Sequence, residues 1–587
     1  MKYIIALIIS ISFALNATEK ATELAQKASA GDSEAQYQLA VLYQKGDTVE
    51  QDEVKAFNWF QQAAHLGHSD AQNSLAIAYL EGQGVEQNKA LAVKWYKQAA
   101  EQGNRNAQYN LAWCYEKGEG AEKNLSQAFF WYQQAAEQGD LDAQSVVAWM
   151  YATAQGTKLN YEQAYQWYLK AATQGHAGAQ NSLGSLYENG QGVEADPTKA
   201  YSWYLKAAEQ GSAYAQYNLA SLYEDGLGVE ADPQQAFIWY KMAAEQGDAD
   251  AQNMVGVFYN TGTGVEKDPE AGFHWYKKAA EQGLMIAEYN LAWMYENGVG
   301  VEQSAAEAMV WYQKAALQGY AAAQYQLGYI YANGELTEQD YAAAVHWYQK
   351  ASELGYPDAQ NNLGNLYEKG KGVAQNYKKA AFWYLKSAEQ GNVYAQYNLA
   401  LAYEDGRGVE QNYQQAAIWY RKAAEAGDSD AQNALGNLYD TGQGVSKNSQ
   451  TAVKWYRLSA QQGNYIGQYN LAWMYDHGVG VAKDKAAAVI WYRKSAEQGY
   501  ASAQNNLAVC YDSGEGVRED DKQAFYWFKK AAENGDPTGQ SNLAIFYSDG
   551  VGVQKNKIKA KYWAGISCEN GNKGACELAQ SLAGSGY

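Results

Sequence analysis

The residues that could do acid–base or metal chemistry are few and do not converge. The chain contains six histidines, which fall at unrelated places in its pattern: His65, His68, His176, His274, His346 and His477. His65 and His68 lie close together, but at the end of a predicted helix, where the helix dipole favours a cation. The sequence contains no nucleophile elbow, no HExxH and no paired-cysteine metal motif. We therefore expect no catalytic residues, no metal site and no cofactor.

The four cysteines are of two kinds. Cys114 and Cys510 stand at apolar positions of helical patterns that are far apart in the chain, so we expect two small buried hydrophobic residues. Cys568 and Cys576 are eight residues apart near the C-terminus. The residues themselves leave a disulfide, free thiols and a metal pair open, although two cysteines without a nearby histidine make a poor zinc site.

A Gly-x-Gly pattern, represented by Gly226 and Gly228, is the one local sequence that resembles a phosphate-binding loop. It stands between two predicted helices and follows no strand, unlike the loops that hold nucleotides. Glycines at such places end a helix and turn the chain, since they allow positive φ or close backbone approach. We interpret them as turn residues.

These local patterns return every 36 residues. The template GSAYAQYNLASLYEDGLGVEADPQQAFIWYKMAAEQ occupies residues 211–246. One glycine recurs in this frame sixteen times, from Gly31 to Gly571, and one tryptophan fifteen times, from Trp59 to Trp563. A constant period without insertions indicates a solenoid of stacked supersecondary units rather than several globular domains.

Each unit is predicted to be a pair of amphipathic helices, which in the template span about residues 213–225 and 232–246. The residues at helical spacing are Ala215, Leu219, Leu222 and Tyr223 in the first helix, and Ala236, Trp239, Tyr240, Ala243 and Ala244 in the second. The residue before the second helix is Asp, Asn or Ser in every unit, which predicts an N-cap.

The pattern AQYNLASLYEDGLGV…D…A…WYKMAAEQG closely resembles the Sel-one-like repeat, a relative of the tetratricopeptide repeat. The resemblance covers residues 31–570 in fifteen repeats and is specific because it recurs in each of them. It implies an all-α fold, a right-handed α/α superhelical solenoid of about 15 helix-turn-helix repeats with terminal capping helices. It also implies that the first helices line the concave face and that the protein is an adaptor assembling protein complexes.

The ends of the chain differ from the repeats. Residues 1–17 combine Lys2, an apolar run over 4–15 and a small residue before Thr18, which predicts a cleaved secretory signal peptide; an uncleaved membrane anchor is the alternative. Residues 18–30 are predicted to form an N-terminal capping helix, and residues 571–587 a truncated capping repeat. No transmembrane segment is expected in the mature chain.

Two turns and one cysteine pair complete the expectations for the fold. At Ala154 the first turn glycine is missing, and at Glu335-Leu336 the second is lost, so we expect these turns to differ locally. Cysteine-rich secreted proteins of the family that the chain resembles have pairs with the spacing of Cys568 and Cys576. In an oxidising compartment we therefore expect a disulfide that holds the final helix, with free thiols or a metal pair as the alternative.

One side of the first helix changes from unit to unit, whereas the core side is nearly constant, so the variable side is the candidate binding surface. The centre of this side is the ninth residue of the helix, which reads Val41, Ile77, Trp113, Trp149, Ser185, Ser221, Val257, Trp293, Tyr329, Asn365, Leu401, Asn437, Trp473, Val509 and Ile545. Tryptophans outside a core pattern are typical of hot spots in protein interfaces.

Three of the four tryptophans have the same companions, 180 residues or five repeats apart. They are preceded by Tyr109, Tyr289 and Tyr469, then Asn110, Asn290 and Asn470, and followed by Glu116, Glu296 and Asp476. Asparagine can pair with an extended peptide backbone, and the acidic residues would favour basic segments. The alternative is that the aromatic residues fill gaps between neighbouring first helices.

The net charge of the chain bears on the class of partner that it can bind. It has 45 basic and 65 acidic residues among 587, a net charge of −20, which disfavours nucleic acid as a partner. The carboxylates recur at turn and surface positions, as expected for a solvated face. We expect a non-enzymatic scaffold in the bacterial cell envelope or secreted space, periplasmic or exported.

Resemblance suggests cell-wall-remodelling enzymes or host proteins as partners. The alternative, also from resemblance to cysteine-rich relatives, is an envelope enzyme or a binder of peptidoglycan fragments or β-lactams.

Overall fold

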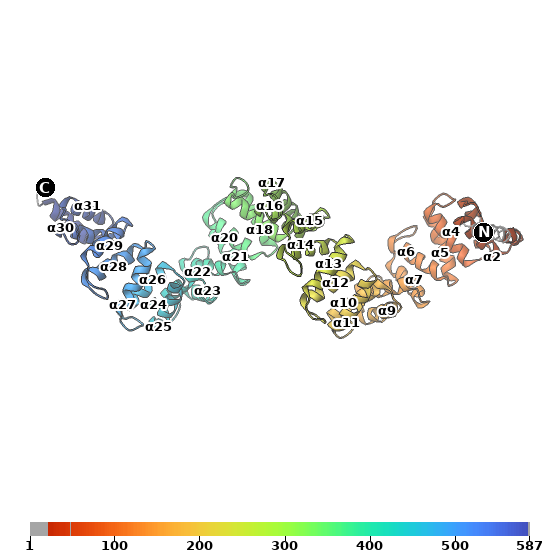
Figure 1. Ribbon diagram of the computed structural model, residues 1–587, viewed down its shortest axis with the longest axis horizontal. Helices are drawn as coiled ribbons and strands as arrows, with labels where there is room; N and C mark the ends of the chain where they lie inside the picture. The colour runs from red at the N-terminus through yellow and green to blue at the C-terminus, as the bar shows by residue number, and fades with distance from the viewer. Residues whose placement is uncertain (1–21, 47–48, 585–587) are drawn as a thin grey trace, which may run out of the picture. The chain divides into compact units, whose positions relative to one another are not determined.

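A computed structural model describes residues 22–46 and 49–584, and all the regular elements in these ranges are helices (Figure 1). The prediction of an all-α chain of repeated helical hairpins is confirmed. The predicted signal peptide, residues 1–17, lies outside the described residues. Of the predicted capping helix over 18–30, residues 22–29 are described and are helical.

Each repeat contributes two helices of 13 residues. The first helices are α2 (Ser33–Lys45), α4 (Ser69–Glu81), α6 (Arg105–Lys117), α8 (Leu141–Thr153), α10 (Ala177–Asn189), α12 (Ala213–Asp225), α14 (Ala249–Thr261), α16 (Met285–Asn297), α18 (Ala321–Asn333), α20 (Pro357–Lys369), α22 (Val393–Asp405), α24 (Ser429–Thr441), α26 (Tyr465–His477), α28 (Ala501–Ser513) and α30 (Pro537–Asp549).

The second helices are α3 (Glu53–His65), α5 (Lys89–Glu101), α7 (Leu125–Glu137), α9 (Tyr161–Thr173), α11 (Pro197–Glu209), α13 (Pro233–Glu245), α15 (Pro269–Glu281), α17 (Ala305–Leu317), α19 (Tyr341–Glu353), α21 (Tyr377–Glu389), α23 (Tyr413–Glu425), α25 (Ser449–Gln461), α27 (Lys485–Glu497), α29 (Asp521–Glu533) and α31 (Lys557–Glu569). A single helix, α32 (Lys573–Gly584), follows them.

The residues form two compact units, each a stack of hairpins in chain order. One comprises Met1–Ala287 with Val299–Val301, and the other Glu288–Gly298 with Glu302–Tyr587. In the second unit, neighbouring first helices touch directly, as α18 does with α20, α24 with α26 and α28 with α30, while the second helices described there approach each other less. These first helices therefore lie next to one another along the stack.

The template hairpin shows why each helix begins and ends where it does. The Asp232 carboxylate accepts hydrogen bonds from the backbone N–H groups of Gln234 and Gln235, so it is the N-cap of α13, as predicted. Gly226 ends α12 in the left-handed conformation, with φ of 69°. Gly228 also has positive φ, and a Cβ there would lie 2.2 Å from the carbonyl oxygen of Pro197. The turn therefore packs directly on the start of α11.

The two exceptional turns behave differently from each other. Ala154 has φ of 57°, the same left-handed region as Gly226, so the local difference expected there is not found. The surrounding hairpin imposes this conformation on a residue that disfavours it. Among the described residues Ala154 is the one non-glycine with positive φ, so Leu336 does not adopt the conformation of Gly228. The turn at Leu336 differs as predicted.

The core follows most of the predicted pattern. Ala215, Leu219, Leu222 and Tyr240 are buried, whereas Tyr223 and Trp239 are only half-buried. Several of the equivalent tryptophans lie under a lysine one turn later; the Lys206 ammonium, for example, is 3.9 Å from the Trp203 ring centroid. The repeated tryptophan therefore packs at the edge of the core, where a cation covers part of its ring.

A buried glutamine joins each hairpin to the one before it. Gln216, 1% exposed, donates from Nε2 to the carbonyl oxygen of Ala208 at the end of α11, and its Oε1 accepts from Gln246 at the end of α13. The contact spans eight residues across the turn between repeats. The same donation is made by Gln36, Gln72, Gln108, Gln144, Gln180, Gln252, Gln324, Gln360, Gln396, Gln432, Gln468, Gln504 and Gln540.

The disulfide occupies this same pair of positions at the C-terminal end. Cys576 stands where the other repeats have the glutamine, and Cys568, eight residues earlier, stands where they have the accepting residue. The two cysteines form a disulfide between α31 and α32, as expected. A covalent bond thus replaces the hydrogen bond that joins the other hairpins. Cys114 and Cys510 are free and buried, as predicted.

One repeat has a carboxylate at the glutamine position. Glu288 is 4% exposed and accepts a hydrogen bond from Gln318 Nε2 at 2.7 Å. Burial raises the pKa of the Glu288 carboxyl, against the hydrogen bond from Gln318, which lowers it. An ionised carboxylate cannot donate a hydrogen bond as the glutamine amide does. This buried position therefore disfavours the charged form of Glu288, although an exposed glutamate is ionised at neutral pH.

We predict that Glu288→Gln stabilises α16 and α17 at pH 7 by about 1–2 kcal/mol, since it removes a buried charge and restores a donor. Because the folded-state pKa of Glu288 is raised, the native state is most stable below the usual range of a glutamate pKa. It loses stability as the pH rises through the raised value. The difference between variant and wild type should therefore vanish near pH 4.

Amide hydrogen exchange of α16 and α17, with both proteins at the same pH, measures this difference. The reciprocal variant Gln324→Glu is the control, and it should destabilise the next repeat at pH 7 but not near pH 4. An effect of Glu288→Gln that does not change with pH would contradict the assignment.

Candidate functional site

The four tryptophans at the ninth position stand on different first helices. Trp113 is on α6 and Trp149 on α8, in consecutive repeats of the first unit. Trp293 on α16 and Trp473 on α26 belong to the second unit and are five repeats apart, so they do not form one cluster. Trp149 is 44% exposed and Trp293 42%, whereas Trp113 and Trp473 are half-buried.

The half-buried tryptophans have identifiable neighbours. Trp113 packs against the core of the first unit beside Tyr109 and Tyr115. Trp473 stacks on His477, with ring centroids 4.2 Å apart and 20° between the planes. These contacts hold the two rings in place and still leave part of each accessible.

The tyrosines that precede three of the tryptophans pack between helices. Tyr109 meets Tyr132 of α7 with ring centroids 5.2 Å apart, and Tyr289 meets Tyr312 of α17 at 5.5 Å. Tyr469 likewise meets Tyr492 of α27 at 5.8 Å. Burial raises the pKa of Tyr109, Tyr289 and Tyr469, so these hydroxyls stay protonated at neutral pH.

The asparagines link neighbouring first helices. Asn110 donates from Nδ2 to Asn73 Oδ1 at 3.1 Å, and Asn470 donates to Asn433 Oδ1 at 2.8 Å. Asn290, at the equivalent position, also interacts within the structure. Part of the hydrogen-bonding capacity that we expected a peptide backbone to use is therefore engaged by the solenoid itself.

The acidic residues also have partners. Glu116 accepts from the Tyr132 hydroxyl at 2.9 Å and Glu296 from the Tyr312 hydroxyl at 2.5 Å. The side chain of Asp476 is one methylene group shorter than that of a glutamate, and it pairs instead with the Lys485 ammonium at 2.5 Å. The carboxylates therefore fasten each first helix to its own second helix, in addition to contributing negative charge.

The histidines take structural positions. His68 and His176 are N-caps of α4 and α10, where Nδ1 accepts a backbone N–H. His68 therefore stands at the start of a helix and not, as the sequence suggested, at the end of one. In the described part of the chain, no three His, Cys, Asp or Glu side chains are grouped as metal ligands would be.

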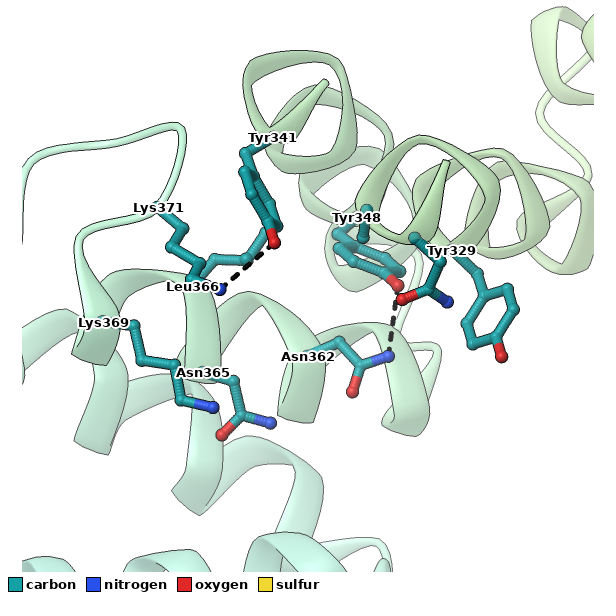
Figure 2. A pocket seen from close by; sticks show the side chains of 10 residues that line it. Tyr329, Tyr341, Tyr348, Asn362, Asn365, Leu366, Lys369 and Lys371 are labelled. Atoms are coloured by element: carbon teal, nitrogen blue, oxygen red, sulfur yellow. Dashed lines mark hydrogen bonds between the residues drawn. The ribbon is translucent and has the colours of Figure 1, made fainter. Parts of the chain in front are cut away.

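Sequence reasoning missed a cavity in the second unit, shown in Figure 2. It has a volume of about 290 Å³ and lies between α18, α19, α20 and the turn after α20. Tyr329 lines it, Tyr348 lies at its base with the Asn362 amide, and Lys369 and Lys371 lie on its other side. A signal was available in the sequence, because six repeats have a glutamate 16 residues before the repeated tyrosine and this repeat has Ala332 there.

Among the described residues, no helix is long and apolar enough to cross a membrane.

Known proteins place the chain in one family. The Sel1 repeat model matches fifteen consecutive segments: residues 33–68, 69–104, 105–140, 141–176, 177–212, 213–248, 249–284, 286–320, 321–356, 357–392, 393–428, 429–464, 466–500, 501–536 and 537–572. None of the curated proteins matches the chain.

Two solved structures are similar to it. A protective antigen of uropathogenic Escherichia coli strains displaying an SLR fold is 33% identical with a TM-score of 0.54, covering 84% of this chain and 93% of its own. A Sel1 repeat protein from Oxalobacter formigenes is 34% identical with a TM-score of 0.45, covering 52% of this chain and 90% of its own. The repeated hairpins, the fifteen matches and the similarity to the antigen show that the chain belongs to the Sel1 repeat family.

Proposed function

We propose that the chain is a non-enzymatic scaffold that binds a partner protein along the surface formed by its first helices. The observation that supports this most is the exposure of Trp149 and Trp293, two large aromatic side chains at the centre of the variable side. Exposed tryptophans of this kind contribute strongly to binding when a partner covers them. Sel1 repeat solenoids are in general scaffolds for protein–protein interactions.

The position of these residues supports the same proposal. In the second unit neighbouring first helices lie next to one another, so a partner segment can contact several repeats at once. The ninth residue varies from repeat to repeat, with seven residue types at fifteen positions, while the core beside it is nearly constant. Repeat proteins distinguish partners by varying surface residues at equivalent positions of a rigid stack of repeats. The half-buried Trp113 and Trp473 would extend the surface to further repeats.

We further propose that the protein acts in the bacterial cell envelope or is exported, with cell-wall-remodelling enzymes or host proteins as partners. The apolar run over residues 4–15 and the small residue before Thr18 favour a cleaved leader. The disulfide between Cys568 and Cys576 favours an oxidising compartment.

We predict that Trp149→Ala with Trp293→Ala weakens the binding of the natural partner at least tenfold, since each tryptophan would lose about 2 kcal/mol as a hot spot. The partner is first identified by photo-crosslinking in cells from an aromatic crosslinker at position 257, the ninth residue of α14. Binding of the purified partner is then measured by calorimetry, and helical content by circular dichroism.

The matched control is Phe130→Ala with Phe382→Ala. These side chains are similarly exposed, at 47% and 50%, but lie on second helices. The control should bind like the wild type, and all three proteins should have the same helical content. The proposal is wrong if the tryptophan variant binds normally, or if the phenylalanine variant loses as much affinity.

The proposed location gives a separate prediction. Protein purified from the periplasm or the culture medium of the bacterium that produces it should begin at Thr18. Its Cys568 and Cys576 should form a disulfide. Intact-mass measurement before and after reduction detects both features. Full-length chain with free thiols at these positions, recovered from the cytoplasm, would contradict the location while leaving the binding surface untouched.

A further inference from the structure

A tyrosine–glutamate hydrogen bond recurs inside the repeats. The hydroxyl of the eighth residue of the second helix donates to a glutamate near the end of the first helix, 16 residues earlier, at 2.5–2.9 Å. The pairs are Tyr132–Glu116, Tyr204–Glu188, Tyr240–Glu224, Tyr312–Glu296, Tyr384–Glu368 and Tyr420–Glu404. In each pair the hydroxyl of a buried tyrosine donates a hydrogen bond to a carboxylate at the surface of the hairpin.

The repeat at residues 321–356 keeps the tyrosine and lacks the glutamate. Tyr348 is 2% exposed, and the glutamate position is Ala332. The Asn362 amide donates to the Tyr348 hydroxyl oxygen at 3.3 Å. This bond uses the hydroxyl as an acceptor, so its proton remains to be donated to another group.

The cavity of about 290 Å³ shown in Figure 2 lies at the place of the missing side chain, and its volume is close to the lower limit of small-molecule sites. Ala332 and Tyr348 both line it, so the cavity contains the space that a glutamate at position 332 would fill. Tyr329, the ninth residue of α18 and 36% exposed, lines it as well. The cavity therefore opens beside the surface that we propose binds a partner.

The charge of the cavity is opposite to that of the chain. Lys369 and Lys371 line it, and none of its lining residues is acidic. The Lys371 ammonium donates to the Tyr341 hydroxyl at 3.1 Å, as Figure 2 shows, and lies 4.8 Å from the centre of that ring. In a protein of net charge −20, this cavity is a local site for a negative group.

Glu368, next to Lys369 in the sequence, has partners of its own. Glu368 accepts from the Tyr384 hydroxyl at 2.7 Å and pairs with the Arg407 guanidinium at 2.9 Å. Its charge is therefore compensated by groups outside the cavity. The two lysines thus remain available to attract a carboxylate from outside.

We propose that this cavity binds the carboxylate of an acidic side chain from a partner polypeptide, in the space that the glutamate occupies in six other repeats. The Tyr348 hydroxyl donates to the incoming carboxylate, and Lys369 and Lys371 balance its charge. The inference rests on the proposed function in one respect, the source of the carboxylate. If the chain is a scaffold that binds proteins, the carboxylate belongs to an Asp or Glu side chain of the partner.

The repeat five units earlier in the chain also lacks the glutamate and can be compared with this one. Ala152 and Tyr168 are the equivalents of Ala332 and Tyr348, so the glutamate is missing there too. The two lysines are replaced by Asn189 and Gln191. The double substitution Lys369→Asn with Lys371→Gln therefore gives the site residues that the same fold already tolerates.

The experiment uses the full chain and a capped Gly-Glu-Gly peptide, with Gly-Gln-Gly and free glutarate as companions. Saturation-transfer NMR titrations give each dissociation constant. We expect the Glu peptide to bind at least tenfold more tightly than the Gln peptide, and to weaken with added salt. The lysine double variant should bind it about tenfold more weakly, and Ala332→Glu, which fills the cavity as six other repeats do, should not bind it measurably.

Ala332→Glu should keep the helical content of the wild type, because the same residue pair is present elsewhere in the chain. Equal binding of the Glu and Gln peptides, or undiminished binding by Ala332→Glu, would overturn the carboxylate site. Binding of glutarate without binding of the Glu peptide would overturn the polypeptide as its source. The tryptophan variant should bind the peptide normally, so failure of this site and failure of the scaffold function are distinguished.

Discussion

A hydrogen bond from a buried glutamine to a carbonyl eight residues earlier joins a hairpin to its predecessor in every repeat except the one with Glu288. The amide side chain reaches the last turn of the preceding second helix, and in most repeats its oxygen accepts from the residue that ends its own second helix. An amide is suited to this position because it donates and accepts at once, and leaving either group unpaired in the interior would be costly. At the C-terminal end the Cys568–Cys576 disulfide spans the same two positions.

The surface of the protein follows from this repeated junction. With Gln216 and its equivalents fixing how hairpins stack, the ninth residue of every first helix returns to an equivalent place in the lattice. Tryptophans such as Trp149 and Trp293 can then be exposed without loss of core packing, since the core residues around them are unchanged. The carboxylates predicted to form an acidic edge also stabilise the repeats, because Glu116 and Glu296 each accept a hydrogen bond from a buried tyrosine hydroxyl. In the repeat that has Ala332 in place of this carboxylate, a cavity lies between the helices.

Much of the fold was predictable from the sequence, because caps, turns and apolar spacing are local signals repeated fifteen times. The N-cap Asp232, the turn glycines and the buried Leu219 are examples. The role of Gln216 was not predicted, since a polar residue at helical spacing looks like a surface residue until the neighbouring helix is present. The prediction that the turn at Ala154 differs from the others was wrong for a similar reason. Tertiary packing holds Ala154 in the left-handed conformation, which alanine by itself disfavours. At the candidate site, composition located the variable side of the first helix, but the partners of Asn110 and Glu116 lie on other helices and could not be assigned from the sequence.

The central claim is that a partner protein is bound by the first helices. Amide hydrogen exchange of the chain, free and saturated with its crosslinked partner, tests it most directly. The account predicts slower exchange in the first helices whose ninth residue is tryptophan, which are α6, α8, α16 and α26, with α7 and α9 unchanged. Slower exchange confined to the second helices would contradict it.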